Sequence, residues 1–235
     1  MLKPQDLLVT FKILSYEIGY SSVESRNHYT RETPWVIFEP ISVYLRERDE
    51  VIVSDEPDDF ETEELALIEQ FILKGESETE RAGWTYRKLA QQLFMSLSEV
   101  SQSIKRASKA GLLIKRGNKD IRVNKTALID YVRFGAGVSF FVERGKVVRG
   151  IPTASAASLF KDIFASSSEF PTVWPCARGT VKGIAIAPIY KSVPKAVMID
   201  PWLYKQLALL DIFRIGSARE KEEAMPYLTK LKGNL

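Results

Sequence analysis

The chain has 235 residues, a length that allows two modest domains with their own cores. Of these residues 45% are apolar and 27% charged, and the net charge is +3. Apolar runs such as GIAIAPIY are far shorter than the about 20 residues that span a bilayer, and Asp6 and Glu17 interrupt any signal-peptide core, so we expect a cytoplasmic protein with no membrane contact. One cysteine, Cys176, and one histidine, His28, exclude a disulfide framework, a cysteine-based zinc site and most histidine-based catalysis, so we expect neither metal nor cofactor.

The small net charge hides a strong segregation along the chain. Residues 39–80 carry 15 acidic and 3 basic side chains, a net charge of −12, whereas residues 84–150 carry 14 basic and 4 acidic ones, a net charge of +10. Segregation on this scale indicates that different parts of the chain meet different partners. The alternative is that both segments form ordinary solvated faces.

The first 83 residues predict two helices separated by short strands. Residues 4–18 repeat apolar side chains at the spacing of one buried helical stripe. Residues 35–55 are rich in β-branched and aromatic side chains and predict two or three strands. Acidic residues then favour a helix over 61–73. Either 4–18 or 61–73 qualifies as the first helix of the unit that follows.

From residue 84 the helix signals become tighter. Thr85 can cap a helix that runs to Leu93. Ser96 and Glu99 form a capping box, in which each side chain satisfies an otherwise unpaired backbone N–H. The helix that they start ends at Gly111, a suitable C-cap. The sequence then predicts a β-hairpin, LLIKRGNKDIRVN, with its tip at Gly117-Asn118, and a further short helix.

The last hundred residues predict a mixture of strands and helices. We expect a second hairpin over 138–150 and strands around Gly179. A loop rich in small residues leads to a helix after residue 152. Two helices close the chain, the first starting at Asp200-Pro201 and the second at a capping box begun by Ser217.

Helix, tight turn, helix and hairpin form the order of a winged helix-turn-helix, whose second helix enters the major groove of DNA. Polar and cationic side chains on the outer face of that helix and on the hairpin are the predicted DNA contacts: Ser98, Glu99, Ser101, Gln102, Lys105, Arg106, Lys109, Lys115, Arg116, Lys119 and Arg122. The first five are expected near base edges, the next two at the DNA backbone, and the hairpin cations over phosphates or the minor groove. The alternatives are a charged helix on the surface of any α+β domain, or a winged helix that binds another protein without touching DNA.

The segment WTYRKLAQQLFMSLSEVSQSIKRASKAGLLIKR resembles the winged-helix core of MarR-like bacterial transcriptional regulators. The residues that carry the resemblance are Leu89-Ala90, Ser96, Ser98, Val100, Ser101 and Ala110-Gly111-Leu112. The match covers about residues 84–125 and implies DNA binding. One departure is Phe94, which stands at a turn position that often holds glycine; a bulky residue at positive φ there is strained by roughly 1 kcal/mol or more. Either the turn is built differently, or Phe94 packs against another part of the chain, such as the N-terminal helix.

The two ends of the chain carry a second resemblance. The start, LKPQDLLVTFKIL, and the later segments VWPCARGTVKGIAIAPIYKSVPKAV and LYKQLALLDIFRIGSARE are similar to bacterial winged-helix proteins that accompany nucleotidyltransferase-type toxins in defence or toxin–antitoxin operons. This resemblance implies an antitoxin or autoregulator role.

These signals together predict an α+β protein. The expected domains are an N-terminal helix of the winged-helix domain at 1–19, an acidic insertion with short strands and a helix at 20–83, a winged helix-turn-helix core at 84–134, and a C-terminal α/β partner-binding or regulatory domain at 135–235.

The predicted function is sequence-specific binding of double-stranded DNA and transcriptional repression, including repression of its own operon, by a homodimer that reads two half-sites. The alternative is an antitoxin-like adaptor that neutralises a partner toxin through its C-terminal domain. We expect no catalysis, because the acidic insertion offers carboxylates without a partner histidine and no G-x-S-x-G element is present. DNA binding should weaken steeply as salt rises, and binding to a globular protein less so.

Overall fold

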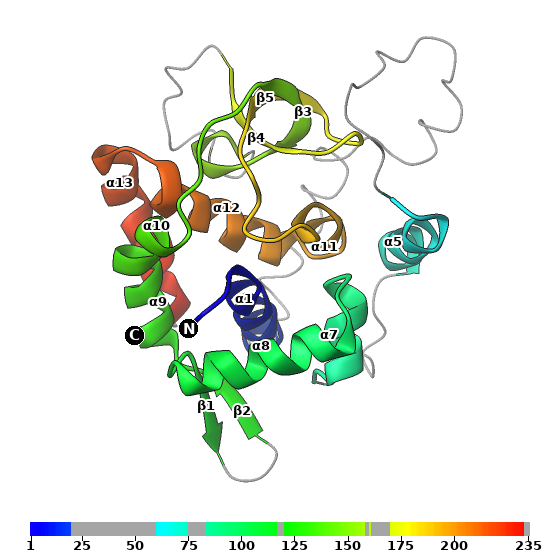
Figure 1. Ribbon diagram of the computed structural model, residues 1–235, viewed down its shortest axis with the longest axis vertical. Helices are drawn as coiled ribbons and strands as arrows, with labels where there is room; N and C mark the ends of the chain where they lie inside the picture. The colour runs from blue at the N-terminus through cyan, green and yellow to red at the C-terminus, as the bar shows by residue number, and fades with distance from the viewer. Residues whose placement is uncertain (20–59, 75–82, 117–119, 158–159, 161–169, 233–235) are drawn as a thin grey trace.

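The computed structural model of the chain describes residues 1–19, 60–74, 83–116, 120–157, 160 and 170–232. The strands predicted for residues 35–55 lie outside the described residues, as does most of the helix predicted after residue 152. The protein is α+β, as predicted, with helices gathered around α1 and two small sheets at opposite ends of the molecule (Figure 1).

The helices are α1 (Pro4–Gly19), α5 (Thr62–Lys74), α7 (Tyr86–Gln92), α8 (Leu97–Lys109), α9 (Lys125–Asp130), η1 (Tyr131–Gly135), α10 (Ala136–Ser139), η2 (Ala154–Ala156), α11 (Val193–Ile199), α12 (Pro201–Ile215), α13 (Ala218–Thr229) and η4 (Lys230–Lys232). The strands are β1 (Leu113–Arg116), β2 (Asp120–Val123), β3 (Val147–Pro152), β4 (Thr172–Pro175) and β5 (Val181–Ala185).

Helix α1 lies at the centre of the fold and is buried on every side. Figure 1 shows it between α8 on one side and α11 and α12 on the other. The predicted stripe, which includes Leu7 and Phe11, is buried, but so are Val9 and Ile13 on the opposite side. The predicted single stripe was therefore too narrow, because a second helical layer covers the face that a surface helix would leave to water.

Polar side chains of α1 connect it to its neighbours. The Lys12 ammonium lies 2.7 Å from Oδ2 of Asp200, the residue that caps α12. Burial alone would raise the pKa of Asp200, but the charge of Lys12 and the hydrogen bonds to the carboxylate lower it. The Tyr16 hydroxyl bonds Gln92 of α7, and the Glu17 carboxylate accepts a bond of 2.8 Å from a backbone N–H of β2. Because buried polar groups are costly without partners, these bonds fix the position and rotation of α1 against its neighbours.

Of the two candidates for the first helix of the predicted unit, the structure places one against the segment that starts at residue 84. Helix α1, rather than α5, packs along α8, and it also contacts α7 and β2. Helix α5 packs instead on α11, where Lys195 and Glu64 form an ion pair of 2.5 Å. Strands β1 and β2 pair in antiparallel register with Leu113 opposite Val123, so both predicted hairpin strands are confirmed. The predicted tip at 117–118 lies outside the described residues.

The second sheet closes on itself, because each of its three strands pairs with both others. Strand β3 runs antiparallel to β4 and to β5, which pair with each other in parallel. A Cβ on Gly150 would come 2.1 Å from the Trp174 carbonyl oxygen, and one on Gly179 would come 2.1 Å from the Gly150 carbonyl carbon. Only glycine fits at these two approaches. The predicted strands around Gly179 are confirmed.

The hairpin predicted over 138–150 is wrong. Its first residues belong to α10, and β3 pairs with strands that come later in the chain. The helix forms here because Val132 and Ala136, four residues apart, are both buried, and Phe140, four residues further, packs edge-on against Tyr131. This four-residue spacing is helical. The sequence was predicted as a strand because a short continuous run of apolar residues fits a strand or a buried helix equally well.

A buried carboxylate joins α12 to the second sheet. Asp211 accepts hydrogen bonds from the Thr153 hydroxyl at 2.8 Å and from the Trp174 indole at 2.6 Å. Its other oxygen lies 2.6 Å from Arg214, whose Nε donates to the Phe140 carbonyl of the α10 segment. Burial raises the pKa of Asp211 against the opposing effect of Arg214. One side chain thus connects α12 to β4, to the residue that follows β3 and, through Arg214, to the end of α10.

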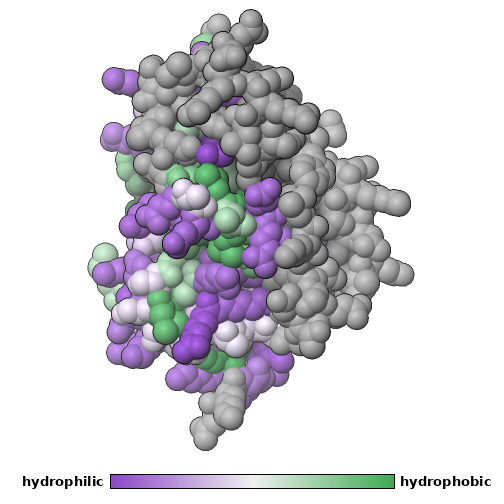
Figure 2. All heavy atoms as spheres, turned by 90° about the vertical axis from the view of Figure 1, so that its right-hand side faces the viewer, coloured by the Kyte–Doolittle hydropathy of each residue, from purple (hydrophilic) through white to green (hydrophobic). Residues whose placement is uncertain are grey.

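The face that carries α5 and α7 is shown in Figure 2, where the described residues are mostly hydrophilic with separate groups of hydrophobic ones between them. Helix α5 carries exposed carboxylates, including Glu63 and Glu69. None of the helices in the described part of the chain has the length and apolar character needed to cross a bilayer.

Candidate nucleic-acid interface

Helix α8 begins at the predicted capping box. The Ser96 hydroxyl accepts a hydrogen bond of 3.2 Å from the Glu99 backbone N–H, and Oε2 of Glu99 accepts one of 3.0 Å from the Ser96 backbone N–H. Thr85 caps α7 through a single bond, in which its hydroxyl accepts from the Lys88 backbone N–H at 3.1 Å. Both predicted helix starts are confirmed, and they fix where the outer face of α8 begins.

Both helices end in the same backbone motif. After α7, the N–H groups of Phe94 and Met95 bond the carbonyls of Gln91 and Ala90. After α8, Gly111 and Leu112 repeat this pattern, so each helix ends in a Schellman motif. The residue that takes positive φ is Phe94 in the first motif, at 51°, and Gly111 in the second, at 76°. The turn is therefore not built differently, and Phe94 takes the positive φ that glycine usually supplies at this position.

The outer face of α8 is a single polar stripe. Four exposed side chains follow one another at intervals of four, three and four residues, which places them on one face. They are Ser98, Gln102, Lys105 and Lys109. The opposite face is buried and mostly apolar, with Val100, Ile104 and Ala107 at 1% exposure or less. This outer stripe of four residues presents hydrogen-bonding groups at its N-terminal half and cations at its C-terminal half.

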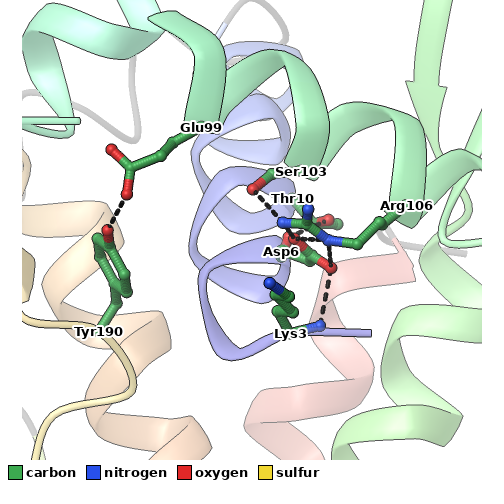
Figure 3. Close-up of polar contacts among 7 residues, drawn as sticks. All are labelled: Lys3, Asp6, Thr10, Glu99, Ser103, Arg106 and Tyr190. Carbon is green, nitrogen blue, oxygen red and sulfur yellow. Dashed lines mark hydrogen bonds and ion pairs between the residues drawn. The ribbon is translucent and has the colours of Figure 1, made fainter. Parts of the chain in front are cut away.

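Glu99, a predicted contact to base edges, is turned to the flank of α8. Its Oε1 accepts a hydrogen bond of 2.5 Å from the hydroxyl of Tyr190, in the segment before α11 (Figure 3). This bond, together with those from Ser96, lowers the pKa of Glu99. Burial and the bond to Glu99 raise the pKa of Tyr190 to about 12. The carboxylate is thus ionised and engaged by the protein rather than directed along the outer stripe.

Arg106, a predicted contact to the DNA backbone, is directed at α1. Its Nε and Nη2 lie 2.9 and 2.7 Å from the two oxygens of Asp6, which is fully buried, and Nη2 also donates to the Ser103 hydroxyl (Figure 3). Asp6 accepts a further bond of 2.8 Å from the Lys3 backbone N–H. The bonds to Asp6 raise the pKa of Arg106. The guanidinium therefore neutralises a buried carboxylate. Two of its N–H groups bond the two carboxylate oxygens, a bidentate geometry that suits arginine.

The remaining predicted contacts lie on or near the paired strands. Lys115 and Arg116 are exposed on β1. Arg122 of β2 is also exposed but pairs with Asp120 at 2.9 Å, which offsets its charge. Ser101 is half-buried beside the outer stripe. Lys119 lies outside the described residues.

Tyr190 is the residue at this site that the sequence analysis missed. The residue after it, Lys191, is exposed, and its charge contributes to the lowered pKa of Glu99. The N-terminal end of α8 is therefore bordered by a segment from the C-terminal part of the chain. An aromatic-lysine pair in a loop carries no motif, so no signal in the sequence pointed to it.

Within the described ranges, no three His, Cys, Asp or Glu side chains are grouped closely enough to hold a metal ion. Searches of protein-family models, of curated proteins and of solved structures found no match to this chain. The resemblance to MarR-like regulators therefore stays a prediction that rests on the residues quoted for it.

Proposed function

We propose that this protein is a sequence-specific DNA-binding transcriptional regulator, acting as a repressor that includes its own operon among its targets. In this proposal α7 and α8 form the helix-turn-helix and β1–β2 the wing. The observation that carries the proposal is the outer stripe of α8, four exposed hydrogen-bonding or cationic side chains opposite a buried and mostly apolar inner face. A major groove admits one such helix.

In this proposal the two ends of the outer stripe contact different parts of the DNA. Ser98 and Gln102 lie towards the N-terminal end, which reaches base edges in helix-turn-helix complexes, and a glutamine amide can bond adenine bidentately. Lys105 and Lys109 suit guanine acceptors or phosphates, and Lys115 and Arg116 suit phosphates beside the groove. Glu99 and Arg106 are positioning residues in this proposal, because their side chains are engaged by Tyr190 and Asp6.

Two copies would bind together. A two-fold symmetric dimer binds two half-sites about one helical turn apart, and the two contacts together supply the affinity that a single helix lacks. The operator is therefore expected to be an inverted repeat.

Replacement of single residues in the stripe tests the proposal. Gln102→Ala or Lys105→Ala should weaken binding to a selected duplex by about 1–3 kcal/mol and relax specificity at one base pair. Lys115→Ala should weaken binding to all duplexes alike and reduce the salt slope by about one. Lys182→Ala is the matched control, because Lys182 is the exposed lysine of β5, outside α8 and the β1–β2 pair. Fluorescence anisotropy with labelled duplexes measures all three, and unchanged affinity in every stripe variant would rule out α8 as the reading helix.

The antitoxin-like adaptor remains the alternative proposal. It places the contact surface on the C-terminal part of the chain and a globular protein opposite it. A complex of that kind should weaken less with salt than a DNA complex, so the same titration separates the two functions.

A further inference from the structure

Three large apolar side chains are exposed along one short helical segment. Phe134, Val138 and Phe141 are 66, 84 and 71% exposed, and they follow one another within eight residues of η1, α10 and the residues just after it. We call these three residues the α10 patch. Single exposed apolar residues are ordinary, but a group of large ones marks an interaction surface.

The segment cannot rotate to bury the patch, because its other side is already packed. Val132 and Ala136 are buried at 1% exposure or less. A Cβ on Gly137 would lie 2.8 Å from the Phe213 carbonyl oxygen, so α10 touches the backbone of α12 at this point. Arg214 of α12 also donates to the Phe140 carbonyl. The exposure of the patch is thus imposed by the packing behind it.

The patch has the size of an interface centre. With aromatic side chains of about 150–250 Å² each, two phenylalanines exposed by two thirds and one valine amount to roughly 300–500 Å². A stable dimer buries about 800 Å² on each partner, with an apolar centre and a polar rim. The patch supplies the centre, and its neighbours must supply the rim.

Charges of both signs border the patch. Asp130 and Glu143 are exposed, as are Arg133 and Arg144, and the Arg133 guanidinium lies 4.6 Å from the centroid of the Phe134 ring. A strongly acidic or strongly basic partner would leave half of these charges opposed by like charges. A two-fold contact places the rim against its own copy, so that acidic and basic residues of one subunit can meet the opposite sign on the other.

We infer that the α10 patch is the contact between two copies of this chain. In Figure 1, α9 and α10 lie along one side of the molecule, and α8 with the β1–β2 pair lies at the bottom. A two-fold axis beside α10 and directed towards β1–β2 leaves the outer stripes of both α8 helices on the same side. The choice of a second copy as occupant rests on the proposed function, since a two-fold reader needs such a contact.

Sedimentation velocity of the full chain, without DNA and over a range of concentrations, tests the inference. The wild-type mass should rise towards twice 26.6 kDa, and Val138→Lys and Phe141→Lys should stay monomeric at concentrations where the wild type is dimeric. Tyr86→Lys is the matched control, because Tyr86 is exposed on α7, on the opposite side of the molecule in Figure 1, and should leave the dimer intact. Circular dichroism melts of the variants verify that they fold.

A wild type that stays monomeric throughout would overturn the inference and assign the patch to another protein. A dimer that survives both patch substitutions would overturn it as well, because the contact would lie elsewhere. Separate anisotropy measurements distinguish the two proposals: a monomer that binds a selected duplex contradicts the patch alone, and a patch-dependent dimer that binds no duplex contradicts the DNA-binding function alone.

Discussion

Phe94 takes a backbone conformation that bulky residues rarely adopt, and the surrounding structure explains why it is tolerated. The two Schellman bonds at the end of α7 require positive φ at this position. The ring packs partly against the core, and Met95, which follows it, is buried at 8% exposure. Packing therefore offsets roughly 1–2 kcal/mol of left-handed strain.

Two substitutions separate the strain from the packing. Phe94→Ala removes the packing and keeps the strain, whereas Phe94→Gly removes both. We expect the glycine variant to be more stable than the alanine variant by about 1 kcal/mol, measured as the free energy of unfolding in urea. The reverse order should hold at Gln91, exposed inside α7, where glycine costs about 1 kcal/mol relative to alanine. The same order at both positions would contradict the assigned backbone.

Arg106 and Lys109 are neighbours on α8 with different expected roles. Arg106→Ala leaves the buried Asp6 carboxylate unpaired, so it should lower the free energy of unfolding by about 3 kcal/mol. Lys109→Ala should change stability by less than about 0.5 kcal/mol but reduce the salt slope of DNA binding by about one. Urea unfolding and anisotropy, with concentrations corrected for folded protein, measure both effects. A reduced salt slope for folded Arg106→Ala would return Arg106 to the DNA-contacting set.

The directions of these side chains show what the sequence could not predict. Helix spacing places residues on a helix face, and it correctly separated the outer stripe from the buried one. The partner of Arg106 is 100 positions away, and that of Glu99 is 91 positions away. Such pairs depend on tertiary packing, so both residues were predicted to face outwards.

At the scale of elements, side-chain hydrogen bonds at two positions on α8 add to the apolar packing of its inner face. Near its start Glu99 bonds Tyr190, and one turn before its end Arg106 bonds Asp6. The first bond connects it to the segment before α11, and the second to α1. These attachments set the angle of the outer stripe relative to the whole molecule.

The Tyr190–Glu99 bond should stabilise the protein over a defined pH range. The pKa of Glu99 lies below its ordinary value of 4.5, so its contribution is complete above about pH 4.5 and is lost as pH falls through the folded pKa. The pKa of Tyr190 is raised from 10.0 to about 12, so its contribution is complete below pH 10 and is lost as pH rises through about 12.

Tyr190→Phe should therefore lower the free energy of unfolding by about 1 kcal/mol, by the same amount at every pH between about 5 and 10. Below pH 4.5 the difference from the wild type should shrink. Urea titrations at several pH values measure it. A difference that grows on acidification would contradict the assigned ionised state of Glu99.

Element boundaries were largely predictable, because their signals are local. The capping box at Ser96, the positive-φ glycine at Gly111 and the Asp200-Pro201 start all operate within four residues of the chain. Helix α11 and the partners of β3 were not predicted. Helix α11 lacks a side-chain cap bond, and β3 pairs with strands more than 20 residues later.

At the scale of the molecule, the predicted units 84–134 and 135–235 are joined by one helical segment and one hydrophobic core. The predicted boundary between residues 134 and 135 falls inside the continuous helical segment of α9, η1 and α10. One hydrophobic core includes residues of α1, α8, α12 and the second sheet. A domain count from length alone could not reveal this, because the central α1 comes first in the chain and packs on elements from both predicted units.

A shared core predicts cooperative unfolding. We expect a single urea transition reported alike by tryptophan fluorescence and circular dichroism. Lys12→Met should shift the whole transition by about 3 kcal/mol, since it leaves Asp200 with its charge buried and unpaired between α1 and α12. Two separate transitions, with only one of them moved by the substitution, would show that the two parts unfold independently.

The central claim is that the outer stripe of α8 reads a DNA sequence, and one ratio tests it most directly. A duplex selected from random sequences by the wild-type protein, and a scrambled duplex of the same composition, are titrated at one physiological salt concentration. We predict binding to the selected duplex at least about 10³-fold tighter, and loss of most of that ratio in the double variant Gln102→Ala, Lys105→Ala. Equal affinity of the wild type for both duplexes would contradict the account.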